Sequence, residues 1–163
     1  MKTLFLLRHA KSSRDDPGLR DFDRPLNDRG KDDAKLIGHY LSKRKIAMSV
    51  VVSSPAKRAR KTAAIVLQTA DLLNEVVFDE RIYEASTQQL LKVVSEIEST
   101  HESALLVGHN PGFEELLTCL TDRAGRMPTA SLAAIELDLN SWRDIAPRSG
   151  ELSWLITPKD LKS

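Results

Sequence analysis

The sequence predicts an α/β protein, a three-layer α/β/α sandwich built around a mostly parallel central sheet. Short apolar runs bounded by turn residues recur along the chain, which is typical of strands buried on both faces. Segments with apolar residues three and four positions apart lie between them, which is typical of helices. The 163 residues suit one compact domain, so we expect residues 1–163 to form a single domain.

The expected strands follow from these apolar runs. Residues 4–7, 50–52 and 104–107 are predicted to be the buried parallel strands, and residues 76–78 form a weaker candidate. Two later segments alternate apolar and polar residues and are predicted to be half-buried strands toward an edge of the sheet, residues 132–139 and 152–157.

Three helices are expected between the strands from apolar residues at helical spacing: Ala34, Ile37 and Leu41; Ala59, Ala63, Val66 and Ala70; and Leu90, Val94 and Ile97. Two helix starts are marked by a capping residue before a proline. The pairs Ser54-Pro55 and Asn110-Pro111 predict that each proline occupies the first helical position. Residues 11–28 show no periodicity, and a loop of that length is usually functional.

Composition narrows the classes of function. There are 24 basic and 23 acidic residues, with two Trp, two Tyr and four Phe, so we expect no nucleic-acid partner. The single cysteine, Cys119, excludes an intramolecular disulfide and a thiolate zinc cluster and is expected in the core. The apolar run at residues 4–7 is too short for a signal peptide or a membrane span, so we expect a cytoplasmic protein with no membrane partner.

Reactive side chains follow three of the predicted strands. Arg8 and His9 come directly after the first, Arg58 lies one turn into the helix after the second, and His109 follows the strand at residues 104–107. Ligands of open parallel sheets bind outside the carboxyl ends of the strands, so two histidines and two arginines should meet in one crevice. The other histidines, at positions 39 and 101, are expected at the surface.

The two arginines indicate an oxyanion ligand. A guanidinium repels a metal cation, but its fork of donors matches phosphate oxygens two at a time, so we expect Arg8 and Arg58 to bind a phosphoryl group. Residues 57–61 contribute four cations at the start of a helix, where the macrodipole also favours anions. For Lys57, Arg60 and Lys61 a solvated helix face is the alternative, and a nucleic-acid or nuclear-localisation patch is a weaker one.

Several motifs together resemble the histidine phosphatase superfamily and, within it, the small SixA-like phosphohistidine phosphatases. They occur in the family's order along nearly the whole chain: Leu6-Leu7-Arg8-His9-Ala10, Arg24-Pro25-Leu26-Asn27, Ser53-Ser54-Pro55-Ala56-Lys57-Arg58-Ala59, Val107-Gly108-His109-Asn110-Pro111-Gly112, and Pro128-Thr129. The resemblance implies a phosphoglycerate mutase-like fold. It also implies that His9 is the nucleophile, that Arg8, Arg58 and His109 bind the transferring phosphoryl group, and that no metal or cofactor is needed.

Two departures from the family pattern bear on the substrate. The first motif reads Arg8-His9-Ala10 where most of the family has glycine after the histidine, as in the SixA-like branch. The acid that protonates an alcohol leaving group has one counterpart, Glu84, and the alternative is an exposed glutamate ahead of the helix expected near Thr87.

The expected function is a metal-independent phosphatase acting through a covalent phosphohistidine, with protein phosphohistidine as the leading substrate. A small-molecule phosphomonoesterase, a phosphoglycerate-mutase-like transferase and a noncatalytic phosphate-binding module remain as alternatives.

Overall fold

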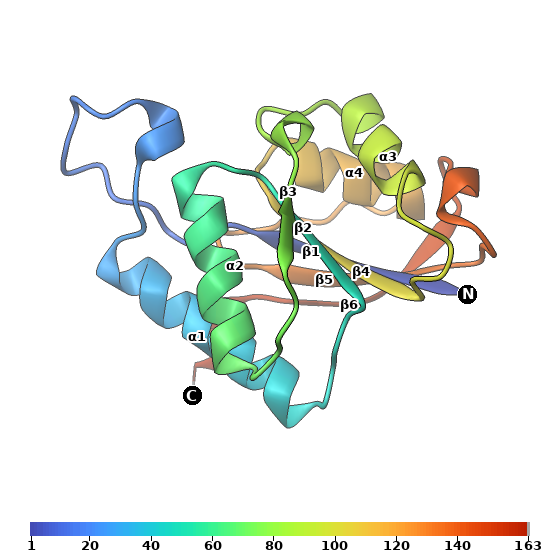
Figure 1. The fold of residues 1–163 in the computed structure, drawn as a ribbon, viewed down its shortest axis with the longest axis horizontal. Helices are drawn as coiled ribbons and strands as arrows, with labels where there is room; N and C mark the ends of the chain where they lie inside the picture. Colours follow the sequence, from blue (N-terminus) through green and yellow to red (C-terminus); the bar gives the residue numbers. More distant parts are fainter. Residues whose placement is uncertain (163) are drawn as a thin grey trace.

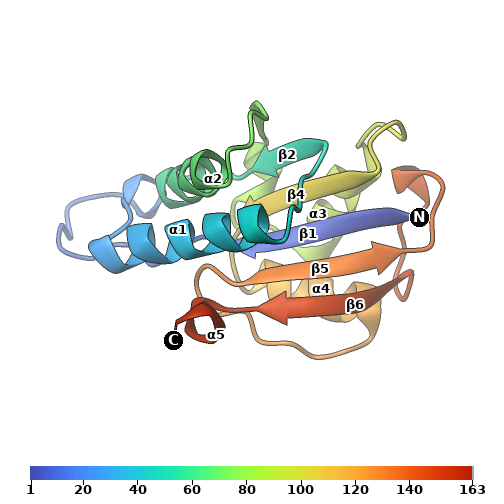
Figure 2. The same ribbon diagram turned by 90° about the horizontal axis from the view of Figure 1, so that it is seen from below.

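The computed structural model describes residues 1–162 and contains a six-stranded sheet with the order β3-β2-β4-β1-β5-β6. Figure 2 shows β2, β4, β1, β5 and β6 running side by side in this order. Their bounds are β1 (Lys2–Arg8), β2 (Val50–Ser53), β3 (Val76–Phe78), β4 (Ser103–Gly108), β5 (Leu132–Leu137) and β6 (Gly150–Ile156). Every strand expected from the sequence is present.

The four strands β1 to β4 are parallel to one another, as predicted, and β5 is antiparallel to both β1 and β6. The strand expected at residues 132–139 is present as β5, next to the edge strand β6, but the expectation that it is half-buried is wrong. Its side chains enter the cores on both faces of the sheet in alternation, so almost all of them are buried.

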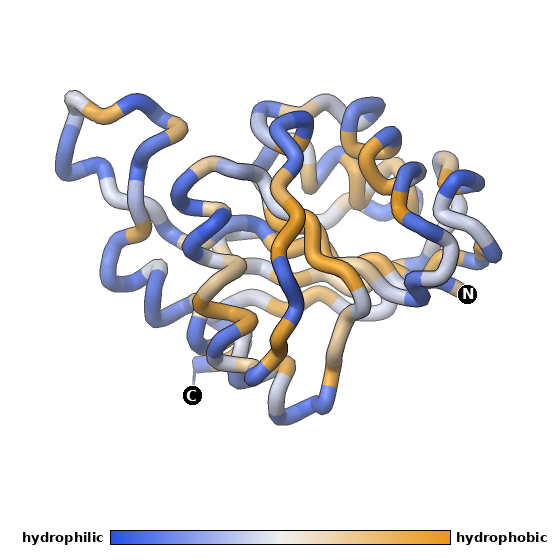
Figure 3. The backbone as a smooth tube through the Cα atoms, in the orientation of Figure 1, coloured by the Kyte–Doolittle hydropathy of each residue, from blue (hydrophilic) through white to orange (hydrophobic). Residues whose placement is uncertain are grey.

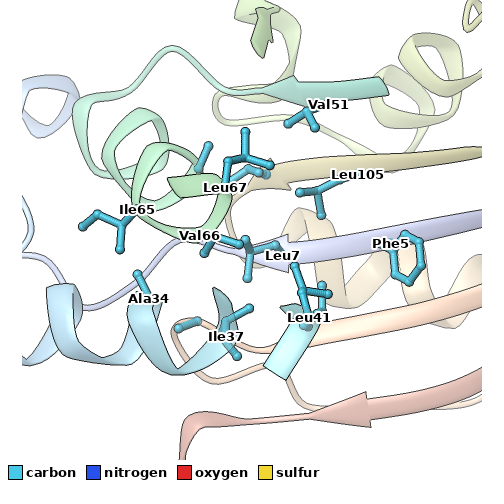
Figure 4. Packing of buried hydrophobic residues seen from close by; sticks show 14 of the residues in the cluster. Phe5, Leu7, Ala34, Ile37, Leu41, Val51, Ile65, Val66, Leu67 and Leu105 are labelled. Carbon is cyan, nitrogen blue, oxygen red and sulfur yellow. The ribbon is translucent and has the colours of Figure 1, made fainter. Parts of the chain in front are cut away.

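Helices cover both faces of the sheet, which gives the three layers visible in Figure 1. α1 (Asp28–Lys43) and α2 (Lys57–Thr69) pack on one face, while α3 (Thr87–Ser95) and α4 (Gly112–Thr121) pack on the other, and the short α5 (Pro158–Leu161) contacts α1. Figure 4 shows the packing on the first face, where Phe5 and Leu7 of β1 meet Ile37 and Leu41 of α1. Alternate β1 residues, Leu4 and Leu6, enter the core on the opposite face, as strand geometry requires.

Both predicted helix starts are wrong, by two residues at α2 and by one at α4. The N-cap of α2 is Ala56 and that of α4 is Pro111, and neither cap is made by a side chain. The polar residues that suggested caps have other partners. Ser54 Oγ accepts a hydrogen bond from Ala56 N–H, and Asn110 Nδ2 donates to the Met127 carbonyl.

The loop between β1 and α1 projects beyond the sheet at the left of Figure 1, and it is mostly hydrophilic in Figure 3. Its two ends are held together by an isolated bridge between Ser12 and Leu26 and by a 2.8 Å bond from Ser13 N–H to the Pro25 carbonyl. A short 3-10 turn spans Asp21–Asp23. The loop is therefore a folded arm, and its 3-10 turn contacts α2. Within residues 1–162 no helix has the length and apolar character needed to cross a membrane.

Candidate active site

Two histidines meet where the central parallel strands end. In the β1–β4 ladder Arg8 lies opposite Gly108, so the next residues, His9 and His109, leave the sheet side by side. Their ring centroids are 5.1 Å apart and both side chains are buried. The two histidines expected to converge therefore do lie together.

The hydrogen bonds of His9 define which ring nitrogen is free. Nδ1 lies 2.7 Å from the Ala10 carbonyl oxygen, which can only accept, so Nδ1 carries the proton and Nε2 carries the lone pair. Burial lowers the pKa of His9 to about 4, and the positive charges of Arg58 and Arg8 lower it as well. The ring is therefore neutral near pH 7, with one nucleophilic nitrogen.

His109 presents a different pattern. Its Nε2 lies 2.8 Å from Ser54 Oγ, a hydroxyl that already accepts the Ala56 N–H and so has its own proton to give. Nδ1 is buried and has no partner among the described residues. Burial lowers the pKa of His109 to about 3, and the neighbouring His9 and Arg58 lower it further. A neutral ring that accepts from Ser54 keeps its proton on Nδ1, which is then a buried donor without a partner among residues 1–162.

Arg58 links His9 to the folded arm. Its Nε lies 3.4 Å from His9 Nε2, while its terminal nitrogens donate to the carbonyl and to Oδ2 of Asp21, at 2.7 and 3.0 Å. A guanidinium has five N–H donors, so one N–H on each terminal nitrogen is left for another acceptor. The guanidinium is buried on α2, and it therefore presents a fixed donor pair beside the nucleophilic nitrogen.

Asp21 is the ionic centre of this arrangement. Tyr83 donates its hydroxyl to Asp21 Oδ2 at 2.6 Å, and Arg24 donates to Oδ1 at 3.0 and 3.2 Å. Burial alone would raise the pKa of Asp21, but the hydrogen bonds from Tyr83 and Arg58 outweigh it and hold the pKa well below its usual range. The carboxylate is ionised at neutral pH and fixes the arm against α2.

Arg8 turns toward the segment that precedes β5. Its NH1 donates to the Met127 carbonyl at 3.0 Å, and its Nε is buried without a partner among residues 1–162. Burial lowers the pKa of Arg8, an effect that the nearby Glu114 carboxylate opposes. Glu114 also accepts the Met127 N–H at 2.7 Å. Arg8 is thus anchored at one end and retains an unsatisfied donor.

Glu84 lies at the surface, on the rim of a cleft of about 390 Å³. The cleft lies between the arm and α4 and is lined by Asp21, Arg58, Tyr83, Glu84, His109 and Pro111 among others. Glu84 has φ 53°, an uncommon conformation for a residue with a side chain, in the turn just before α3. A larger hollow of about 620 Å³ lies beside α4 and includes neither histidine. The smaller cleft is lined by His109 and Arg58, and His9 lies behind them in contact with both, so we assign the chemistry to the smaller cleft.

Sequence reasoning missed the ion network around the arm. Asp21 and Tyr83 were not singled out, and Arg24 was named only as part of a family motif, without a role. The available signals were that motif and the length of the loop. The expectation that Cys119 belongs to the core is not met, since the side chain is half-buried. Of the two remaining histidines, His39 is exposed as expected, and His101 is half-buried.

Comparisons with known proteins agree with this geometry. Residues 4–90 match the histidine phosphatase superfamily (branch 1). The chain is 32% identical to an uncharacterized chloroplastic protein of Arabidopsis thaliana, over 95% of this chain and 75% of that protein. It is 26% identical to the phosphohistidine phosphatase SixA of Escherichia coli, over 98% of this chain and 96% of that protein.

A solved structure of the protein histidine phosphatase SixA complexed with tungstate has the same fold. The TM-score is 0.86 at 22% identity, and the alignment covers 98% of this chain and 99% of that one. The sandwich described above is the phosphoglycerate mutase-like fold. Since the family match spans more than half of the chain, this protein belongs to the histidine phosphatase superfamily and is a phosphatase that acts on a phosphorylated substrate.

Proposed function

We propose that this phosphatase hydrolyses protein phosphohistidine through a covalent phosphohistidine on His9 and needs no metal. The observation that carries the proposal is the state of the His9 ring. It is neutral at cytosolic pH, its Nδ1 is held by the Ala10 carbonyl, and its Nε2 lone pair lies beside the Arg58 guanidinium.

The reaction has two steps. The substrate imidazole is first protonated by solvent on its other ring nitrogen. His9 Nε2 then attacks phosphorus, the P–N bond breaks, and the leaving nitrogen keeps the electron pair, so that a neutral imidazole departs. Water then attacks the phosphoryl group on His9, which releases inorganic phosphate and restores the neutral ring. In the loose transition state of this transfer, negative charge rests on the equatorial oxygens.

Three donors serve those oxygens in the proposal. Arg58 offers its two remaining terminal N–H groups, His109 offers Nδ1–H, and Arg8 offers its buried, unpaired Nε. All three are held by other contacts before substrate arrives, so little reorganisation is needed when charge develops. A noncatalytic binding module would not require the lone pair on His9.

The substrate class is supported by likeness and by chemistry. The Escherichia coli relative is a phosphohistidine phosphatase, and Glu84, the one candidate acid, lies exposed at the rim of the cleft. An imidazole nitrogen can be protonated before the P–N bond breaks, so its departure needs no enzyme acid. An alkoxide must gain a proton as it leaves, which a small-molecule phosphomonoesterase or a mutase-like transferase would have to provide.

The mechanism is tested first at His9. His9→Ala is expected to abolish turnover of a phosphohistidine peptide while circular dichroism stays native, and quenched native protein should carry acid-labile, alkali-stable phosphate on His9. Activity is expected to persist in chelator. Hydrolysis by folded His9→Ala protein would overturn the covalent route.

Glu84→Gln separates the substrate classes. A general acid typically contributes about 10²- to 10⁴-fold to the rate. This change should therefore severely impair hydrolysis of a phosphomonoester with a poor leaving group, such as glycerol phosphate, and spare a phosphohistidine peptide. The rates for both substrates are compared in native and variant protein. Equal, large losses would contradict the assignment, as would a native preference for the phosphomonoester.

A further inference from the structure

A second hollow, outside the cleft described above, lies between α2 and the edge strand β3. Its volume is about 340 Å³, and its lining is Lys57, Arg60, Lys61, Ala64 and Phe78. Arg60, Lys61 and Ala64 lie three, four and seven positions after Lys57, so the four α2 residues share one face of the helix. Phe78 forms the opposite wall and is 50% exposed. We call this feature the α2–β3 groove.

The α2–β3 groove is strongly cationic. No carboxylate of residues 1–162 forms an ion pair with any of its three cations. Arg60 donates only to the Pro55 carbonyl, at 2.8 Å. The adjacent Arg58, by contrast, is buried and paired with Asp21. Unpaired cations beside an exposed aromatic ring complement an acidic segment that also carries an apolar side chain.

The groove adjoins the active site. Lys57 is the residue next to Arg58, and the Asp79 N–H that follows Phe78 donates to the carbonyl of Ser53 at the end of β2. Arg58 Nε lies 3.4 Å from His9 Nε2, so the groove begins one residue from the phosphoryl site. From Lys57 to Ala64 a helix rises about 10 Å, so about three extended residues span the length of the groove.

We propose that the α2–β3 groove docks an acidic segment of the substrate protein, three to six residues from its phosphohistidine. Carboxylates of that segment contact Lys57, Arg60 and Lys61, and one apolar side chain packs on Phe78. This inference rests on the proposed function, because it assumes that the substrate is a protein. It assigns selection among phosphoproteins to a surface separate from the phosphoryl site.

The test uses two synthetic peptides with one central phosphohistidine. One carries three glutamates and a leucine at positions three to six on each side, and the other carries glutamines in place of the glutamates. For native protein we expect kcat/KM to be about 3- to 10-fold higher with the acidic peptide, the range that a few exposed ion pairs supply. The preference should shrink as salt is added.

The variant Lys57→Glu/Lys61→Glu should abolish or reverse this preference, because two of the three groove cations change sign. The matched control is Lys31→Glu/Lys35→Glu on α1, which changes net charge by the same amount at two exposed residues that are also four apart; it should keep the preference. Phe78→Ser should remove the advantage of leucine over serine in the acidic peptide.

The outcomes separate the two proposals. If native protein hydrolyses neither peptide, the proposed function fails. If it hydrolyses both peptides at equal kcat/KM, the phosphohistidine substrate stands and the docking groove is wrong. Equal loss of preference in the α1 control would also overturn the groove, because general electrostatic steering would then explain it. Binding of single-stranded oligonucleotide or anionic vesicles to the groove in preference to the acidic peptide would overturn the proposal as well.

Discussion

The two buried histidines should make the stability of this protein depend on pH in a defined window. Above pH 6.5 the rings are neutral in the folded and the unfolded protein. As the pH falls below about 6.5, the unfolded chain takes up a proton on each ring, whereas folded His9 does not until about pH 4. The unfolded state binds more protons in this window, so the free energy of unfolding must decrease as the pH decreases.

The size of the effect follows from the two pKa values of His9. With a pKa of about 4 in the folded protein and about 6.5 in the unfolded chain, lowering the pH from 7 to 5 removes about 2 kcal/mol. His109, with a pKa of about 3, adds a loss of similar size. Removal of the His9 ring should therefore abolish about half of the loss that the pair causes.

Urea unfolding of native protein and His9→Gln, followed by tryptophan fluorescence at pH 7 and pH 5, measures this directly. We expect the native protein to lose about 2 kcal/mol more than the variant between the two pH values. Between pH 7 and pH 8 the stabilities of the two proteins should change in parallel. An identical pH dependence from pH 7 to pH 5 would refute the argument that the His9 ring is held neutral in the fold.

Three further substitutions test parts of the site. Arg58→Ala should lower kcat on a phosphohistidine peptide by about 10²- to 10³-fold, as loss of a transition-state donor does. Arg58→Lys should recover only part of that activity, because a point charge lacks the forked donors of a guanidinium. A loss under tenfold for Arg58→Ala would contradict this role. Ser54→Ala should cost about 1 to 3 kcal/mol in chemical denaturation, because a buried ring nitrogen loses its partner; no change would refute that contact. Gly30→Ala places a Cβ 2.1 Å from the Lys11 carbonyl oxygen and should cost about 1 to 3 kcal/mol, whereas Gly18→Ala, in the exposed arm, should change the unfolding free energy by less than about 0.5 kcal/mol.

The sheet could be predicted from the sequence because its strands are short, apolar and bounded by turns. The runs at residues 4–7, 50–52 and 104–107 each lie inside an observed strand, and residues 76–78 match β3. The burial of β5 could not be predicted in the same way. Alternation along residues 132–139 reports side-chain polarity, while burial on both faces depends on the two cores that its alternate residues enter, whose other members lie far away in the sequence.

The helix starts were misplaced because Ser54 and Asn110 have the composition of caps but serve other segments. Ser54 contacts His109, which lies 55 residues away in the sequence. Asn110 contacts the Met127 carbonyl, which lies 17 residues away. Local propensity contains no information on such contacts.

The phosphoryl-site candidates were accessible to sequence reasoning because each follows a strand end. The acidic counterpart of Arg58 was not, since Asp21 lies in an arm without periodicity. Its position depends on Ser12 and Leu26 pairing at the base of that arm. Motif order indicates which residues belong together, but the ion network that holds them depends on the three-dimensional path of the loop.

The position of β4 in the sheet has a consequence for how the protein is made. β4 lies between β2 and β1, yet it follows both of them in the sequence. A ribosome has to synthesise more than 100 residues before β4 exists to join β1 and β2. Until then the backbone edges of β1 and β2 that pair with β4 have no partner. Such late, long-range pairing slows folding. Nascent chains that end before Ser103 should therefore need chaperone protection, whereas chains that extend beyond α4 can close the parallel half of the sheet and bring both histidines together in one step.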